Sequence, residues 1–263
     1  FAINSVLGQT FDDFELLVIG DGCTDDSAQV VTAIEDTRVR WINLAANTGH
    51  QSGPNNRGLQ EARGEYIAYL GHDDIWLSHH LECSIHELEA TGAAMSQTLA
   101  LRVLPGNTIG LPHLRQGGAP SSRMHRRSIV EKIGGWNDYR SLKIAPETDL
   151  YLRALDAGFA AIVVPRLSVI KFPAARRKDA YLNRPNHEQD EWSRRAKSEP
   201  TFEATYLAHM IQAMVGEMPR EMPIRRLAST FGAEIASRTV ARFRRATSVD
   251  SSGIDKHKKF KGL

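Results

Sequence analysis

Cysteine is scarce in this chain of 263 residues, which has only Cys23 and Cys83. Two cysteines are too few for a disulfide scaffold or for a C-x-x-C zinc site, so a reducing compartment is the default expectation. No apolar run approaches ~18 residues, which argues against a membrane-spanning helix. No internal repeat indicates a solenoid. The chain begins with Phe1, and no signal-peptide pattern follows it.

The net charge of +2 hides an uneven distribution of charge. From Lys171 onward there are 19 Lys and Arg against 11 Asp and Glu, a balance of +8, whereas residues 1–170 have 14 against 20, a balance of −6. An acidic first part is typical of a cation-binding enzyme core, and a basic second part suits a phosphate-rich partner or an anionic membrane surface. Charged helix faces exposed to solvent explain the same balance equally well.

The first part of the chain alternates short apolar runs with helical patterns. Strands are expected at 15–20, 39–44 and 65–70, with helices at 25–35 and 54–63 and a third helix that carries Leu77, Leu81, Ile85 and Leu88 and ends at Gly92. This order predicts a parallel sheet with crossover helices. Farther along, the sequence predicts strands at 95–103, 161–164 and 167–172, helices at 128–133, 147–157 and 201–245, and loops at 104–119 and 173–200.

Two of the expected strands end in acidic clusters, GDGCTDD at 20–26 and GHDD at 71–74. Ligands of an open parallel sheet bind beyond the carboxyl ends of its strands. Hard divalent cations bridge carboxylates to phosphates, so the clusters predict a metal–diphosphate site. The alternative is that these acids cap the following helices. Between the clusters, NTGHQSGPNNRG at 47–58 offers glycines, amides and Arg57 to a phosphate or a base.

Four segments occur in one order: FDDFELLVIGDGCTDDS, NTGHQSGPNNRG, ARGEYIAYLGHDD and GGW…PETDLYLRALDAG. With them the chain resembles family 2 glycosyltransferases of the GT-A fold. The resemblance implies an α/β fold with a Rossmann-like, mostly parallel sheet flanked by helices. It also implies that a first, central strand is missing before Phe1. The expected divisions are a GT-A domain at 1–172, a lid at 173–200, a helical C-terminal extension at 201–246 and a basic, disordered tail at 247–263.

The resemblance further implies sugar transfer from a nucleoside-diphosphate sugar to an acceptor hydroxyl, with inversion and with Mg²⁺ or Mn²⁺. Asp21 matches the family's base-binding acid, and Asp73 the last acid of its metal-binding Asp-x-Asp motif. Glu147 falls on the catalytic Asp and is the expected general base; the alternative is an acid stabilised by the helix dipole. The other expected site residues are Asp149 beside the base, Gly22, Asn47, Gly49, Asn55, Arg57 and Asp74 around the donor, Trp136 on the acceptor side or in the core, and His187 as a further metal ligand.

The expected partners are a UDP-, GDP- or dTDP-sugar and a glycan or lipid-linked acceptor of bacterial polysaccharide synthesis, with no nucleic acid. The expected location is the cytoplasm, with peripheral contact at the inner face of the membrane through the basic C-terminal region. Cations and rings between Arg176 and His187 could close over a diphosphate, and the stretch Ile224–Arg245 could lie on anionic lipid or pack on the domain.

Two other functions stay open. A catalytically weak or inactive nucleotide-sugar-binding relative is suggested by Gly20, Gly71 and Glu147, which stand where the family has Asp. A His-Asp metal phosphohydrolase would combine His72 and Asp73 with His79, His80 and His86. That class is mainly helical, whereas the HDD segment ends a β-like run. A Rossmann dehydrogenase is disfavoured because no third glycine follows Gly20-x-Gly22.

Overall fold

The structure is a computed structural model that describes residues 1–105, 111–113, 119–173 and 187–217. Its helices are α1 (Ala2–Leu7), α2 (Ser27–Thr32), α3 (Ser52–Glu61), α4 (His80–Thr91), α5 (Arg127–Ile133), α6 (Pro146–Asp156), α7 (His187–Ser198) and α8 (Phe202–Glu217). Its strands are β1 (Leu16–Gly20), β2 (Val39–Asn43), β3 (Tyr66–Ala68), β4 (Ile75–Trp76), β5 (Met95–Arg102), β6 (Leu111–His113), β7 (Arg123–Arg126) and β8 (Ala161–Lys171). Two 3-10 turns, η1 (Pro120–Ser122) and η2 (Tyr139–Ser141), complete the described elements.

The described strands form two sheets. β1 and β2 pair in parallel as a small sheet of their own, and the larger sheet has the order β3-β7-β5-β8-β4, with β6 added to β5. Within the larger sheet β5 and β8 run parallel, whereas the pairs of β3 with β7, β7 with β5, β4 with β8 and β5 with β6 are antiparallel. The predicted α/β class is confirmed, but the prediction of a mostly parallel sheet is wrong for the larger sheet, in which β5 and β8 are the only parallel pair among the described strands.

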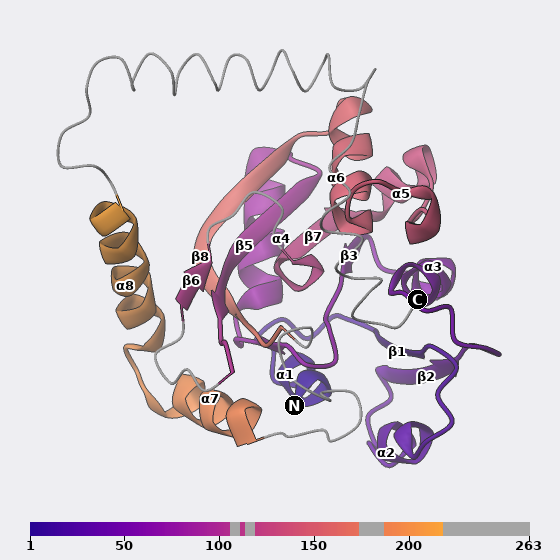
Figure 1. The fold of residues 1–263 in the computed structure, drawn as a ribbon, viewed down its shortest axis with the longest axis horizontal. Coiled ribbons are helices and arrows are strands. Elements are labelled where there is room, and N and C mark those ends of the chain that lie inside the picture. The colour runs from indigo at the N-terminus through magenta and orange to yellow at the C-terminus, as the bar shows by residue number, and fades with distance from the viewer. Residues whose placement is uncertain (106–110, 114–118, 174–186, 218–263) are drawn as a thin grey trace.

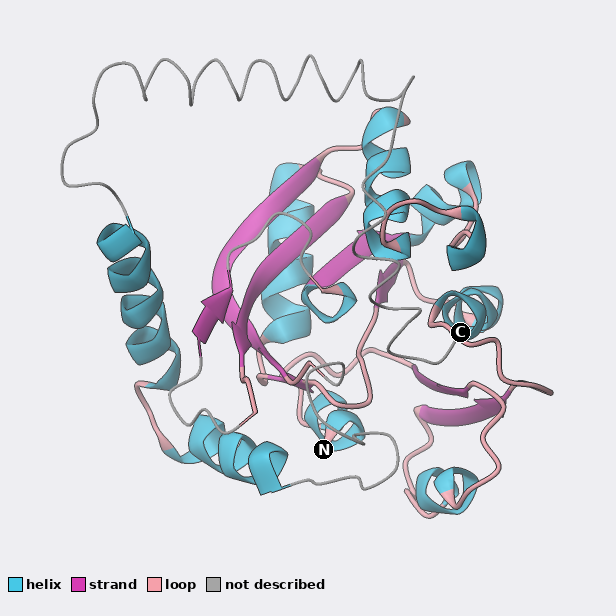
Figure 2. Ribbon diagram, viewed as in Figure 1, coloured by secondary structure: helices cyan, strands magenta, loops and turns pink. Residues whose placement is uncertain are grey.

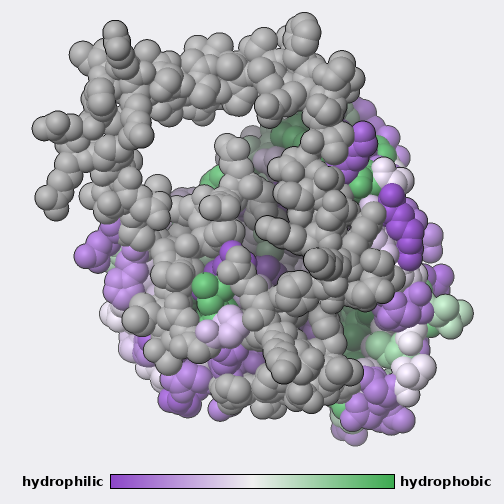
Figure 3. Space-filling view, in the orientation of Figure 1, coloured by the Kyte–Doolittle hydropathy of each residue, from purple (hydrophilic) through white to green (hydrophobic). Residues whose placement is uncertain are grey.

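Helices cover the larger sheet on more than one side (Figures 1 and 2). Behind β5 and β8, α4 contributes Leu81 and Leu88 to a core cluster shared with Val169 of β8. A second cluster joins the sheet to α7 and α8 through Trp192, Phe202 and Tyr206. Because helices cover both faces, four consecutive residues of β8, 167–170, are buried. The described residues visible in Figure 3 are mostly hydrophilic.

The two strands expected at 161–164 and 167–172 are one strand, β8, with an irregularity at Pro165. The register with β5 runs from Met95↔Ala161 to Gln97↔Val163 and resumes at Leu99↔Leu167 after a shift. Proline has no N–H to donate to the ladder, so pairing is interrupted there while the chain stays extended. The predicted break is therefore a shift in pairing within a single strand.

The prediction of a loop over 173–200 is wrong for 187–198, which form α7. The segment has little apolar periodicity, but its charges suit a helix. Glu188 and Asp190 lie in the first turn, and Arg195 and Lys197 in the last, where each sign complements the helix dipole. Likewise β6 lies inside the loop expected at 104–119.

The helix predicted over 201–245 falls within the described residues only as far as 217. α8 ends at Glu217, and the remainder of the predicted helix, the stretch Ile224–Arg245 and the tail from 247 fall outside the described residues. None of the helices in the described part of the chain is long and apolar enough to cross a bilayer.

Candidate active site

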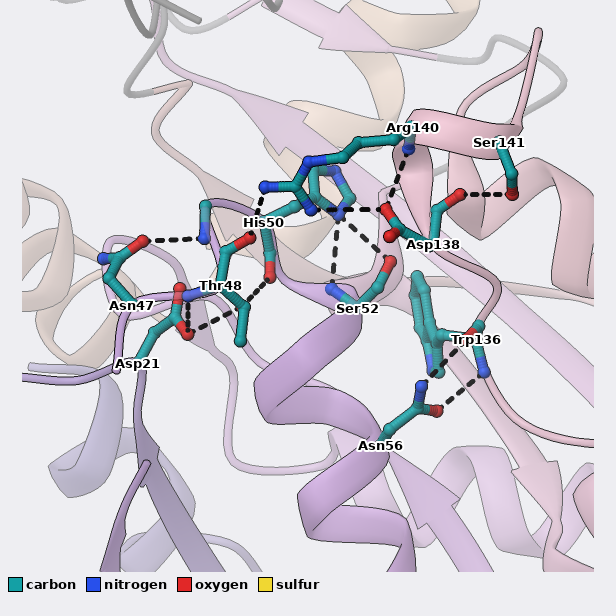
Figure 4. A network of polar contacts seen from close by, with 11 residues as sticks. Asp21, Asn47, Thr48, His50, Ser52, Asn56, Trp136, Asp138, Arg140 and Ser141 are labelled. Atoms are coloured by element: carbon teal, nitrogen blue, oxygen red, sulfur yellow. Dashed lines mark hydrogen bonds and ion pairs between the residues drawn. The ribbon is translucent and has the colours of Figure 1, made fainter. Parts of the chain in front are cut away.

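The turn after β1 is tied to the loop that precedes α3. Asp21 follows β1, and its Oδ1 accepts hydrogen bonds from the backbone N–H and the hydroxyl of Thr48, at 2.9 and 2.7 Å (Figure 4). Gly22 has a φ of +69°, and a Cβ there would lie 2.4 Å from the backbone nitrogen of Asn47. Glycine is therefore required at this position. The two predicted donor-binding residues, Asp21 and Gly22, hold the 47–49 loop against the edge of the small sheet.

The same loop is ordered internally and by a second segment of the chain. Oδ1 of Asn47 accepts from the backbone N–H of Gly49 at 2.7 Å. The ring of His50 stacks on that of Tyr139 with 4.8 Å between centroids, and the Arg140 guanidinium lies 4.6 Å from the centre of the Tyr139 ring. Arg140 also donates to the carbonyl of Thr48 at 3.3 Å (Figure 4). Sequence reasoning missed Tyr139 and Arg140, because no motif surrounds them.

The predicted acceptor-side loop is fastened to α3 by one asparagine. Asn56 donates from Nδ2 to the carbonyl of Trp136 and accepts at Oδ1 from its backbone N–H, both at 2.8 Å (Figure 4). The Trp136 side chain is buried, with 5% exposed, and meets the ring of Tyr69 edge-on at 5.1 Å. The structure therefore places Trp136 in the core, which was the alternative to stacking on an acceptor sugar.

The expected base, Glu147, lies at the beginning of α6. Pro146 occupies the first helical position, where a missing N–H costs nothing. The half-buried Glu147 accepts at Oε2 from the side chain of Gln51 at 3.3 Å, and its backbone carbonyl accepts from Arg123 at 2.8 Å. Gln51 directly precedes α3, so the carboxylate lies beside the loop that carries Thr48 and His50. This position suits both a general base and an acid that stabilises the N-terminus of α6.

Asp149, two residues after Glu147, is held by hydrogen bonds to neighbouring side chains. Its Oδ2 accepts from Nε of Arg153 at 2.8 Å and from Asn137 at 3.0 Å, and its side chain is 14% exposed. Arg153 in turn donates to the carbonyls of Ile133 and Gly135 at 2.8 and 2.6 Å. Asp149 therefore positions the 133–137 loop, and its predicted place among the catalytic residues finds no support in these contacts.

The two adjacent acids of the GHDD segment have different environments. Asp74 is fully buried, and both of its oxygens are engaged: Oδ1 accepts from the backbone N–H of Phe172 at 3.0 Å, and Oδ2 from Lys171 at 2.9 Å and from the hydroxyl of Ser121 at 2.5 Å. Because protein groups hold both oxygens in a fully buried position, a further contact with a sugar donor or a metal is disfavoured. Asp74, predicted at the donor site, instead anchors the turn to the end of β8.

Asp73 is the acid that fits a cation. In the described part of the chain its carboxylate makes no hydrogen bond or ion pair with another side chain. Burial raises the pKa of Asp73, and the Asp74 carboxylate beside it raises the pKa further. A carboxylate whose ionised form is disfavoured in this way gains from a bound cation. Asp73 thus fits a divalent ion shared with a diphosphate, while no group of three or more His, Cys, Asp or Glu within the described residues forms a complete protein cage.

The two glycines that replace family acids are closely surrounded. A Cβ on Gly71 would lie 2.9 Å from Oδ1 of Asp73, and a Cβ on Gly20 would lie 2.5 Å from both the Trp41 ring and Oδ1 of Asn43. Neighbouring side chains therefore occupy the space that acids at 20 and 71 would need.

Three further predicted site residues, Arg57, Asn55 and His187, make no described contact with Asp21, Asp73 or Glu147. Arg57 pairs with Glu61 at 2.6 Å, one turn toward the C-terminal end of α3 and away from the 47–51 loop. Asn55 is half-buried on the same helix. His187 is the first residue of α7, but its side chain lies outside the described part of the chain, as do Arg176, Arg177, Lys178, Tyr181 and Arg184.

The phosphohydrolase alternative is wrong. His79 Nε2 lies 3.2 Å from the carbonyl of Leu167, and His80 Nδ1 lies 2.8 Å from the hydroxyl of Ser168. Both histidines therefore face β8, and His80 is fully buried. They do not join His72 and Asp73 in a metal site.

Comparison with known proteins gives a consistent picture. The family model described as "Glycosyl transferase family 2" matches residues 1–136, more than half of the chain. An uncharacterized glycosyltransferase of Nostoc sp. is 38% identical over 137 residues, which cover 51% of this chain and 42% of that protein. An Escherichia coli UDP-Glc:alpha-D-GlcNAc-diphosphoundecaprenol beta-1,3-glucosyltransferase is 33% identical over 87 residues, 33% of this chain and 34% of that one. The matched part spans less than half the length of these relatives.

Among solved structures, the chain is similar to TarS of S. aureus, residues 1–349, in complexes with UDP and with UDP-GlcNAc. Both comparisons have a TM-score of 0.55 at 19% identity and cover 65% of this chain, with 55% and 53% of the respective TarS chains. At this identity the likeness concerns the fold.

Proposed function

The chain belongs to glycosyl transferase family 2, and from that premise we propose that it transfers a sugar from a nucleoside-diphosphate sugar to an acceptor hydroxyl, with inversion at the anomeric carbon. The observation that carries the proposal is the meeting of three segments. Gln51 at the start of α3 contacts Glu147, and the loop before α3 contacts Asp21. Ser121 binds the turn that contains Asp73, and Arg123, two residues later, binds the start of α6. A donor bound along this line would have its reacting end beside Glu147.

The donor side of the proposal rests on Asp21 and the loop that it orders. With Oδ1 held by Thr48, the Asp21 carboxylate has a fixed direction, and its Oδ2 accepts no hydrogen bond from the described residues. An N–H of a nucleotide base is a suitable donor to that oxygen. Arg140, which lies across the same loop, adds a positive charge on the rim where a diphosphate would enter. Solved relatives of this fold carry UDP and UDP-GlcNAc, which makes a uridine nucleotide the first donor to test.

Glu147 is the residue proposed to remove the acceptor proton. The acceptor oxygen would attack the anomeric carbon as its proton passes to an oxygen of Glu147, and the bond from that carbon to the diphosphate would break with its electron pair on the leaving group. One such displacement inverts the configuration. Gln51 holds one Glu147 oxygen at 3.3 Å, which leaves the other to face an acceptor.

Asp73 is the residue proposed to hold Mg²⁺ or Mn²⁺. Such an ion neutralises negative charge on the diphosphate as it leaves. The other residues of the turn support Asp73: Asp74 is fixed by Lys171 and Phe172, and Ser121 also accepts from the backbone N–H of Gly71 at 3.2 Å. They keep the Asp73 carboxylate in place without competing for the cation.

The proposed acceptor is a lipid-linked saccharide of bacterial polysaccharide synthesis. This proposal is supported by relatives from Escherichia coli and Campylobacter jejuni, which are named as glucosyltransferases that act on undecaprenol-linked sugars. We place the reaction in the cytoplasm at the inner face of the membrane, where the net positive C-terminal part would favour anionic lipid.

A second candidate function is nucleotide-sugar binding with weak or no transfer. The observation that favours it is the packing around Gly20 and Gly71, which leaves Asp73 as the sole acid of the family's metal motif. The two functions are separated by donor turnover. The full chain, with Mn²⁺ and an undecaprenol-linked acceptor, is assayed with UDP-, GDP- and dTDP-sugars, and release of the nucleoside diphosphate is measured. Turnover that depends on Glu147 supports transfer, whereas binding of UDP without turnover under any of these conditions supports the second function.

A further inference from the structure

A small cavity lies between α6 and the larger sheet, and Glu147 is one of its walls. Its volume is about 30 Å³, enough for a group of a few heavy atoms or for ordered water. Met95, Met124, Ile129, Leu150, Tyr151 and Ala154 make most of its lining apolar. The cavity therefore lies between Glu147, the proposed base, and apolar side chains of the protein interior.

Two residues of the lining carry buried polar atoms that lack a hydrogen-bond partner among the described residues. They are Nε1 of Trp136 and Oγ of Ser96, in side chains that are 5% and 3% exposed. Buried polar atoms are nearly always paired, so two of them at one cavity indicate a missing partner. The indole N–H only donates, and a hydroxyl can also donate. Both atoms are suited to an oxygen that accepts.

Three other polar residues of the lining, Tyr69, His125 and Arg123, are already paired. The Tyr69 hydroxyl and His125 Nε2 are 3.0 Å apart, and His125 Nδ1 lies 2.9 Å from the carbonyl of Arg126. Burial raises the pKa of Tyr69; the indole of Trp136 is near enough to oppose that rise, although it lacks hydrogen-bond geometry to the Tyr69 oxygen. Arg123 is directed to the carbonyl of Glu147. Among the described residues of the lining, the fully buried polar atoms without a partner are thus Trp136 Nε1 and Ser96 Oγ.

We propose that this cavity receives the acetamido group of an N-acetylated sugar bound in the active site. The carbonyl oxygen of that group would accept from Trp136 Nε1 and Ser96 Oγ, and its methyl group would lie against the methionine and leucine side chains. Water could also satisfy the polar atoms, but it would not complement the apolar lining as a methyl group does. A plain hydroxyl would do the same. The inference rests on the proposed function, because a sugar must stand beside Glu147 for its acetamido group to reach the cavity.

The sugar could belong to the donor or to the acceptor, and an NMR experiment on the full chain separates the two sources. The chain has four tryptophans, so its indole N–H signals are few, and Trp136→Phe identifies the one that matters. In the donor arm, UDP-GlcNAc is compared with UDP-glucose. In the acceptor arm, protein saturated with UDP receives methyl N-acetylglucosaminide or methyl glucoside. A shift of the Trp136 indole signal with the N-acetylated compound alone, in either arm, supports the proposal and names the source.

The opposite results are equally definite. A Trp136 signal that ignores the N-acetylated compounds in both arms, or moves as far with the plain sugars, overturns the proposal. A protein that does not bind UDP at all contradicts the uridine donor of the proposed function, whereas one that binds UDP with a silent Trp136 signal contradicts only the cavity assignment.

Selectivity in transfer gives an independent test. Trp136→Phe keeps one aromatic ring and removes the N–H with the pyrrole part of the indole, and Ser96→Ala removes the hydroxyl. Each is expected to lower the kcat/KM ratio of N-acetylated to plain substrate by about tenfold, the effect of one buried hydrogen bond. Ser84→Ala is the matched control, because Ser84 is 1% exposed but lies on α4, away from the cavity. An unchanged ratio in both cavity variants overturns the proposal; an equal fall in Ser84→Ala does so too.

Discussion

Lys171 at the end of β8 donates to the fully buried carboxylate of Asp74 across 2.9 Å, joining residues 97 positions apart. The ion pair fixes the turn that presents Asp73. Replacing Asp74 with Ala would leave the Lys171 ammonium and the N–H of Phe172 without their shared partner. Because breaking a buried pair leaves an uncompensated charge, we expect a loss of about 3–5 kcal/mol in the free energy of unfolding, measured in urea.

The control for Asp74→Ala is Asp12→Ala. Asp12 also lies near an arginine, Arg38 at 3.9 Å, but its side chain is 91% exposed. An exposed pair contributes little, so this variant should change the free energy of unfolding by less than about 0.5 kcal/mol. Equal effects of the two variants would contradict the anchoring role of Asp74.

Asp73 should trade stability for metal binding. Its pKa is raised by burial and by Asp74, so above that pKa its negative charge destabilises the metal-free fold. Asp73→Asn is therefore expected to unfold at a higher temperature than the parent chain at pH 7 without metal. It should also lose the rise in melting temperature that Mn²⁺ and UDP together give the parent. A variant with an undiminished Mn²⁺-dependent rise would show that Asp73 is not the metal-binding acid.

His80 should make the fold sensitive to acid. Burial lowers the pKa of His80 to about 3, against 6.5 for an ordinary histidine. The unfolded chain therefore binds the extra proton first, so this contribution to stability is complete above pH 6.5 and is lost as the pH falls toward 3. At pH 5 the loss is about 2 kcal/mol for this one residue. Unfolding in urea at pH 7 and pH 5 measures it.

His80→Gln should make the dependence on pH shallower, whatever its own effect at pH 7. His86→Gln is the matched control, because His86 is exposed on the same helix. If the His80 and His86 variants show the same dependence on pH, the buried neutral state of His80 is refuted.

Neighbouring asparagines on α3 should have separate effects. Asn56→Ala removes both hydrogen bonds to the backbone of Trp136 and should lower the free energy of unfolding by about 1–3 kcal/mol. Asn55→Ala, at a position predicted to bind the donor, should weaken UDP binding with a change in stability of less than about 0.5 kcal/mol. Chemical unfolding and UDP titration of both variants check this division, which fails if Asn55→Ala is the more destabilised of the two.

Local signals in the sequence were enough for most elements of the first half. The apolar runs of β1, β2 and β5 and the left-handed Gly92 at the end of α4 matched their predictions closely. β7 was missed because RMHR has no apolar alternation, and its place depends on β3 and β5 on either side. α7 was missed because charges and a few aromatic contacts, with little periodicity, define it.

The site shows the same division between local and distant information. The motif order predicted site roles for Asp21, Asp73 and Glu147, but it could not distinguish the environments of the adjacent acids Asp73 and Asp74. Asp74 is fixed by hydrogen bonds from Lys171 and Phe172, which lie almost a hundred positions away in the sequence. Arg140 reaches the 47–49 loop from a turn that has no motif of its own. Long-range contacts of this kind have no signature in a single sequence.

The role of Glu147 as the base is the central claim, and one comparison of variants tests it most directly. Glu147→Gln and Asp149→Asn each remove one charge from the first turn of α6 and keep the size of the side chain. Sugar transfer is measured for both with the same donor and acceptor, together with binding of UDP. We expect Glu147→Gln to lose about 10²–10⁴-fold in kcat with unchanged UDP binding, and Asp149→Asn to keep transfer within about tenfold of the parent. Transfer by Glu147→Gln at the parent rate would contradict the role of Glu147 as the base.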